Sequence, residues 1–172
     1  MQITSTFGLA LIAGLIGCAT AQVNTDWDAN AQFTNYHTYA WMDTPHMQAM
    51  QQATLFDRRL RGSVEEQLTA EGLRKADANG EADLLLVYHT GVKDKIDVQQ
   101  WGYFGRQWDV REYQQGTLVL DLVDAKSKSL VWRGTASGEV SGGADPSSDT
   151  IAKTIKKMFE GYPGDVNRGN RR

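Results

Sequence analysis

The chain has little of what disulfide scaffolds and nucleic-acid binders need. It contains one cysteine among 172 residues, which excludes an internal disulfide. Its net charge is only -3, which gives no basic surface for phosphate contacts, so we expect no nucleic-acid partner. The sequence still has 41% apolar residues and five tryptophans, enough for one packed core.

Catalytic motifs are absent as well. The sequence has no Gly-x-Ser-x-Gly, no His-Glu-x-x-His and no phosphate-binding loop. His89 is close in sequence to Asp83, Asp94 and Asp97, but spacing along strands does not bring such groups to one substrate atom. We therefore predict a non-enzymatic protein without catalytic residues, in which these side chains are solvated at strand ends.

Metal and cofactor sites have equally weak support. His46, Met47 and Met50 are residue types that bind Cu(I), yet they lie in a Met- and Gln-rich connector with the composition of a linker. We predict no metal ligand and no cofactor.

The single cysteine ends an apolar segment near the N-terminus. Residues 7–16 are almost unbroken apolar sequence and lead through Leu15-Ile16-Gly17 to Cys18. This pattern is typical of a lipoprotein signal, in which the chain is cut before the cysteine and the thiol is acylated with palmitate. We therefore expect a signal peptide over 1–17 and a lipid on Cys18. The neutral Ala19 favours the outer membrane, with the protein facing the periplasm.

A second cleavage site lies close by. Ala19-Thr20-Ala21 has the small-x-small pattern of an ordinary signal peptidase site, which would release a soluble periplasmic or secreted protein starting at Gln22. About 155 residues remain after either cut, the size of one domain.

Two segments have helical periodicity. Thr54 and Asp57 form an N-terminal capping pattern, and Gly72 is typical of a left-handed helix end. The apolar positions between them are Phe56, Leu60, Val64 and Leu68. The second helix has its apolar stripe at Ile151, Ile155, Met158 and Tyr162, and it ends near Gly161 and Pro163.

The remaining segments predict strands. Residues 33–42 alternate, and residues 82–92 include a continuous apolar run typical of a strand covered on both faces. Residues 96–104 and 110–113 flank a hairpin, and residues 116–124 and 129–140 form another around a polar turn. The predicted inward residues of these last two strands are Leu118, Leu120, Leu122, Leu130, Trp132, Gly134, Ala136 and Val140. The predicted outward residues are Asp121, Arg133, Ser137 and Glu139.

This order predicts one α+β domain over 33–163. Strands follow one another between two helices, in the order β-α-β-β-β-α, which favours a largely antiparallel sheet of four to five strands with both amphipathic helices on one face. Residues 18–32 are expected to form the lipidated N-terminus and a short tether. Residues 164–172 are expected to be a disordered basic tail.

One aromatic segment is the best candidate for contact with a partner. Trp and Tyr together with Arg dominate protein-interaction hot spots, and aromatic rings also stack on sugars. The candidate contact residues are Trp101, Tyr103, Phe104, Arg106 and Trp108. The alternative is a hairpin whose aromatic rings pack across the two strands.

Several segments resemble a known family. Residues 23–28 and 36–41 form its opening pattern, residues 82–89 and 116–124 its middle, and Leu130-Val131-Trp132-Arg133-Gly134-Thr135-Ala136-Ser137-Gly138-Glu139 its most recognisable stretch. In these segments the sequence resembles the domain-of-unknown-function 4136 (DUF4136) family of bacterial envelope lipoproteins. The resemblance implies an anchored envelope protein with one α+β domain and supplies no catalytic residues.

Together these observations predict a lipid-anchored envelope protein of interaction or structural role, with the membrane as one partner and an envelope protein or glycan as another. The alternative is a periplasmic ligand-binding or hydrolytic protein that uses the aromatic residues 101–108 at its site.

Overall fold

The computed structural model describes residues 21–42, 54–77, 81–101, 107–140 and 145–164, with the backbone alone for 95–101 and 107–113. It has α+β architecture, as predicted. The elements are β1 (Gln22–Trp27), a 3-10 turn η1 (Phe33–Asn35), β2 (Thr38–Trp41), α2 (Leu55–Ala70), β3 (Arg74–Lys75), β4 (Leu84–Trp101), β5 (Gln107–Asp124), β6 (Leu130–Val140) and α3 (Ser148–Phe159).

The strands form one mixed sheet with the order β1-β6-β5-β4-β2-β3. The three pairings from β1 to β4 are antiparallel, whereas β2 runs parallel to both β3 and β4. The sheet has six strands, so the expected four to five is too low. The two extra strands are short edge strands with no long apolar run of their own.

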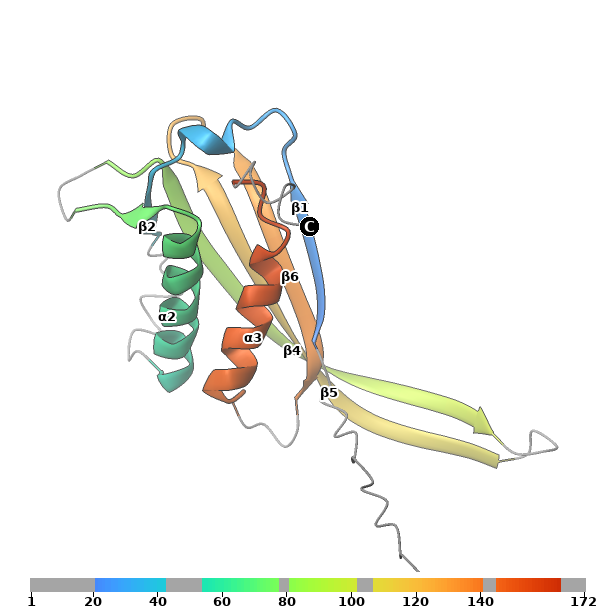
Figure 1. Ribbon diagram of the computed structural model, residues 1–172. Coiled ribbons are helices and arrows are strands. Elements are labelled where there is room, and N and C mark those ends of the chain that lie inside the picture. Colours follow the sequence, from blue (N-terminus) through green and yellow to red (C-terminus); the bar gives the residue numbers. More distant parts are fainter. Residues whose placement is uncertain (1–20, 43–53, 78–80, 102–106, 141–144, 165–172) are drawn as a thin grey trace, which may run out of the picture.

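Helices α2 and α3 lie side by side on one face of this sheet, as expected (Figure 1). Thr54 caps α2 by accepting a hydrogen bond from the Asp57 backbone N–H at 3.2 Å. At the other end Gly72 has a φ of 88°, and the Leu73 N–H bonds back to Leu68 O. The capping residues therefore fix both ends of this helix where the sequence predicts them.

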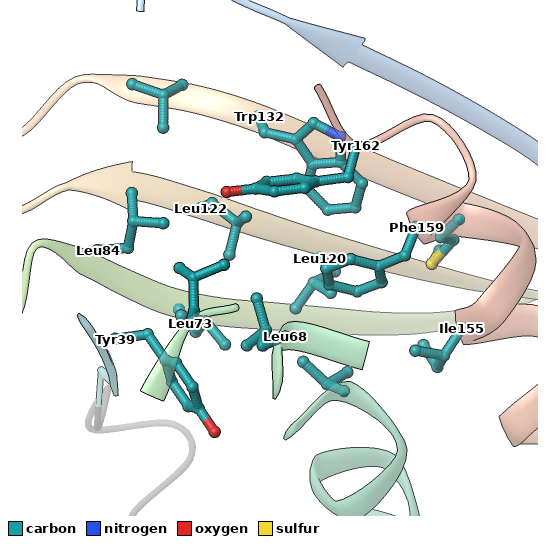
Figure 2. Packing of buried hydrophobic residues seen from close by; sticks show 14 of the residues in the cluster. Tyr39, Leu68, Leu73, Leu84, Leu120, Leu122, Trp132, Ile155, Phe159 and Tyr162 are labelled. Atoms are coloured by element: carbon teal, nitrogen blue, oxygen red, sulfur yellow. The ribbon is translucent and has the colours of Figure 1, made fainter. Parts of the chain in front are cut away.

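The core lies between the helices and the sheet (Figure 2). Trp132 is fully buried, with its ring centroid 5.2 Å from that of Phe159 on α3. Tyr162 packs edge-on against the same indole at 6.1 Å. The fully buried aliphatic residues of the cluster are Leu60, Val64, Leu68, Leu84, Leu86, Leu120, Leu122 and Ile155.

The N-terminal part of the domain differs from the prediction. Residues 22–27 form β1, which pairs antiparallel with β6, although the sequence analysis places them in a tether. The predicted strand over 33–42 is shorter, because residues 33–35 form a 3-10 turn that inserts Phe33 into the core. In the sequence, only three residues therefore separate Cys18 from the first strand.

Two predictions about sheet faces are also wrong. Leu130 is 42% exposed and does not face the core. A bulge between Leu122 and Val123 leaves Val131 without a register partner on β5 and turns it into the core cluster instead. The helices cover only one face of the apolar run at the start of β4, although Val87 on the other face is also buried. Its residues alternate, with Leu84 and Leu86 beneath the helices and Leu85 half-buried on the opposite face.

The strands β4 and β5 are longer than predicted. The sequence analysis divides this region into four short segments, whereas the structure pairs all 18 residues of β4 with β5, from Leu84 and Asp124 to Trp101 and Gln107. The far end of this hairpin extends beyond both helices (Figure 1).

Gly134 makes room for the central tryptophan, which generates a stability prediction. A methyl group at Gly134 would lie 2.6 Å from the Trp132 ring, whereas a methyl group at Gly62 on α2 meets nothing within 4 Å. We expect Gly134→Ala to lower the free energy of unfolding by about 1–3 kcal/mol. As the matched control, Gly62→Ala should raise it by about 0.5–1 kcal/mol. Urea denaturation measures both, and equal effects would contradict this packing.

Candidate functional site

Trp101 and Trp108 of the aromatic segment lie at the far end of the paired strands β4 and β5. Trp101 is the last residue of β4 and Trp108 is the second residue of β5, where it pairs with Gln100. The hairpin thus carries this segment away from the two-layer body (Figure 1). Tyr103, Phe104 and Arg106 lie outside the described residues, so their role in partner contact remains a prediction.

A groove opens at the other end of the extended hairpin, where the sheet leaves the two helices. It has a volume of about 400 Å³ and a mainly apolar surface. Phe56 and Leu60 from α2 and Ile151 and Thr154 from α3 form its helical side. The sheet side comes from residues 90–92, 114, 116–118 and 136–140. About nine residue steps, or roughly 30 Å of strand, separate it from the hairpin tip.

Small residues on the sheet create this space. Gly116 and Gly138 pair with each other across β5 and β6, and Ala136 follows at the next inward position. A methyl group at Gly116 would lie 2.9 Å from Val140 Cγ1, so even the smallest side chain would crowd the groove. The sequence analysis does not identify the groove. The available signal is the pair Ala136 and Gly138, two small residues that share one face of a strand.

The charges around the groove are acidic. Asp145 lies among its lining residues, and the described part of that lining contains no Lys or Arg. Both helices begin beside the groove, but their first turns are already capped. Ser147 accepts the Thr150 N–H at 3.2 Å, as Thr54 does for Asp57. Asp57 and Asp149 further offset the positive helix ends. The groove therefore suits a neutral apolar group better than an anion.

A polar cluster joins α2 to the sheet. The Tyr88 hydroxyl donates to Asp57 Oδ1 at 2.6 Å, and Arg61 Nε donates to the same oxygen at 2.9 Å. Burial and the bond to Asp57 raise the pKa of Tyr88 to about 12. Burial acts to raise the pKa of Asp57, but the hydrogen bonds from Tyr88 and Arg61 outweigh it and lower that pKa.

The cluster continues along α2 to the edge of the sheet. Glu65 Oε1 accepts hydrogen bonds from Trp41 Nε1 at 2.8 Å and from Lys75 Nζ at 2.7 Å. The guanidinium of Arg61 lies 4.7 Å from the Trp41 ring centroid. Each of these groups has a partner that holds α2 against β2 and β3, so the cluster is structural.

The acid–base candidates of the sequence do not form a site. His89 is exposed on the face away from the helices. Asp83 accepts hydrogen bonds from the backbone N–H groups of His37 and Thr38, each at 2.9 Å, which lower its pKa and fix the entry to β2. Asp94 accepts from Gln114 at 3.2 Å, and the side chain of Asp97 lies outside the described part.

The metal candidates cannot be placed in the same way. His46, Met47 and Met50 lie outside the described residues. Among the residues that are described, no group of three or more His, Cys, Asp or Glu side chains is placed to hold a metal ion.

Asp121 is a buried acidic residue on the face of the sheet away from the helices. It faces away from the helices, as expected, but it is only 5% exposed. Arg133 on β6 binds it with two hydrogen bonds of 2.7 Å, from Nε to Oδ1 and from Nη2 to Oδ2. This two-bond pair links the central strands on the uncovered face of the sheet.

The fold belongs to the class of two-layer α+β domains, in which the helices cover one face of a single mixed sheet. A family model described as "Domain of unknown function (DUF4136)" matches residues 23–164, and the chain belongs to this family. The resemblance noted in the sequence is therefore confirmed as to family.

Two solved structures share the fold. A DUF4136 family protein from Bacteroides thetaiotaomicron has 13% identity and a TM-score of 0.51, over 84% of this chain and 97% of that one. A PDZ domain protein from Parabacteroides distasonis has 13% identity and a TM-score of 0.57 over 84% of this chain, which spans only 36% of that protein. A search of curated proteins finds no match in sequence.

The Asp57–Tyr88 bond generates a prediction about acid stability. The pKa of Asp57 is below its ordinary value of 3.8, so the bond stabilises the fold above that pH and the gain is lost as pH falls through the lowered pKa. Tyr88→Phe should cost about 1 kcal/mol at neutral pH. It should also make the fall in unfolding free energy between about pH 5 and pH 3 shallower.

Urea denaturation at a series of pH values measures both effects. Tyr162→Phe is the matched control, because its buried hydroxyl has no hydrogen-bond partner among the described residues. Identical acid profiles for Tyr88→Phe and the unaltered protein would show that this bond does not lower the pKa of Asp57.

Proposed function

We propose that this protein is a lipid-anchored module of the cell envelope. In this proposal Cys18 holds it on the periplasmic face of the outer membrane, and it has an interaction or structural role without catalysis. The observation that carries the proposal is the position of Cys18. It ends an apolar segment with the pattern of a lipoprotein signal. Only three residues separate it from β1, which begins at Gln22.

The structure supports a close attachment to the membrane. Four residue steps from Cys18 to Gln22 reach about 14 Å at most, so the domain would lie almost on the bilayer. No described helix is long and apolar enough to cross a membrane. A single acyl chain gives only marginal binding, so the proposal requires more than one chain on the cysteine.

An interaction role fits the arrangement of the described side chains. Asp57, Asp83 and Asp121 are held by hydrogen bonds that join strands and helices, while His89 is exposed away from them. The hairpin, in contrast, carries Trp101 and Trp108 well beyond the body, where they would meet a partner protein or glycan.

Ligand binding is the second candidate, because the groove has a volume within the range of about 300–1,000 Å³ typical of small-molecule sites. This version places the ligand in the groove and not at the aromatic residues 101–108, since roughly 30 Å of strand separates the two.

The lipid anchor is tested by Cys18→Ser. Because the thiol is the point of attachment, the substitution should abolish incorporation of labelled palmitate and release the protein from the membrane pellet. A soluble protein with its N-terminus at Gln22 in both the variant and the unaltered protein would instead establish cleavage after Ala21, and labelled, pelleting Cys18→Ser would exclude the anchor.

The hairpin tip is tested by replacing Trp101 and Trp108 with Ser together. Crosslinking in intact cells from residues 101–108, with captured species identified by mass, should lose its envelope partner. The unfolding midpoint should change little, because the tip lies far from the core. Lost stability with unchanged partner capture would indicate that the rings pack across the hairpin instead.

A further inference from the structure

The groove lies close in sequence to Cys18, the proposed site of lipid attachment. This proximity suggests what occupies the groove. Ala21, the first described residue, is itself one of the groove's lining residues. Cys18 precedes it by three residue steps, a reach of about 10 Å. Any acyl chain on Cys18 would therefore start within about 10 Å of Ala21 at the groove.

We propose that the groove is a shelter for one acyl chain of the lipid on Cys18 of the same molecule. The inference rests on the proposed lipid anchor. It states in addition that the fold can withdraw part of its own anchor from the bilayer. Since the strength of membrane binding depends on how many acyl chains are inserted, sheltering one chain would weaken the attachment.

The chemistry of the groove fits an acyl chain attached to protein better than a free fatty acid. Its walls are formed by apolar side chains such as Phe56, Leu118 and Ile151. Asp145 at the groove would repel a free carboxylate, whereas an acyl chain linked to Cys18 has no charge. The capped first turns of both helices offer an anionic head group little compensation.

Exposure within the groove points the same way. Val92 is 61% exposed although it lies on the helix-facing side of β4. On the same side of the strand, burial increases from Tyr88 to Leu86 toward the core. The apolar surface therefore continues from the core to the open end of the groove, and an acyl chain lying along it would cover Val92 and Leu118 together.

The test uses the full-length protein in intact cells. The photoreactive residue p-benzoylphenylalanine is introduced at position 154, whose natural Thr154 lines the groove, and cells are labelled with alkynyl palmitate. After irradiation and digestion, the peptide containing position 154 should be joined to the N-terminal lipopeptide of the same chain. The same residue at position 152, where Ala152 is exposed on α3, is the matched control and should give a roughly tenfold lower yield.

A second position guards against loss of folding. The photoreactive residue at position 90, on the sheet side of the groove, should give the same crosslink. Placing a charge in the groove with Thr154→Asp should reduce the yield from position 90 by roughly tenfold, while Ala152→Asp should leave it unchanged.

Each other outcome overturns the proposal in a distinguishable way. Palmitate on Cys18 with equal crosslinking from positions 154 and 152 would show that the acyl chain lies elsewhere, while the anchor stands. Crosslinks to free phospholipid or to another protein would assign the groove to that occupant. Absence of palmitate from Cys18 would remove the anchor and this inference together.

Discussion

The rest of the structure depends on a difference in length between the sheet and the helices that cover it. Helix α2 has 16 residues, or about 24 Å at the helical rise, whereas β4 and β5 have 18 residues each, or about 60 Å of strand. The helices therefore cover only part of the central hairpin. The remaining part forms an extended arm (Figure 1). The apolar groove lies where the helices stop covering the sheet.

Packing within the covered part is held in place by the central tryptophan. The Trp132 side chain lies over Gly134 and contacts Phe159 and Tyr162 from the C-terminal end of α3 and the turn after it (Figure 2). At that end the helix is close to the sheet. Toward its first turn, small residues such as Gly116 and Gly138 replace bulky ones, and the layers no longer fill the space between them. Strand β6 therefore carries both Trp132, where the helix and the sheet pack closely, and Gly138, where the groove lies between them.

Local patterns in the sequence predict much of this fold. The four-residue spacing from Phe56 to Leu68 identifies α2, and its caps at Thr54 and Gly72 are where the sequence places them. The alternation around Leu120 gives the central strand and its inward face. These predictions are correct because periodicity and capping depend on neighbours a few residues away, which the sequence displays directly.

The sequence by itself determines the helices, the central antiparallel hairpins and the likeness to the DUF4136 family, because each depends on local pattern. Only the tertiary structure decides which residues meet across the sheet. Pairing of β1 with β6 turns a predicted tether into a strand and brings Ala21 to the groove. The bulge at Val131 exposes Leu130, and Arg133 buries Asp121. These results depend on register between distant strands, since a shift of one residue reverses every face.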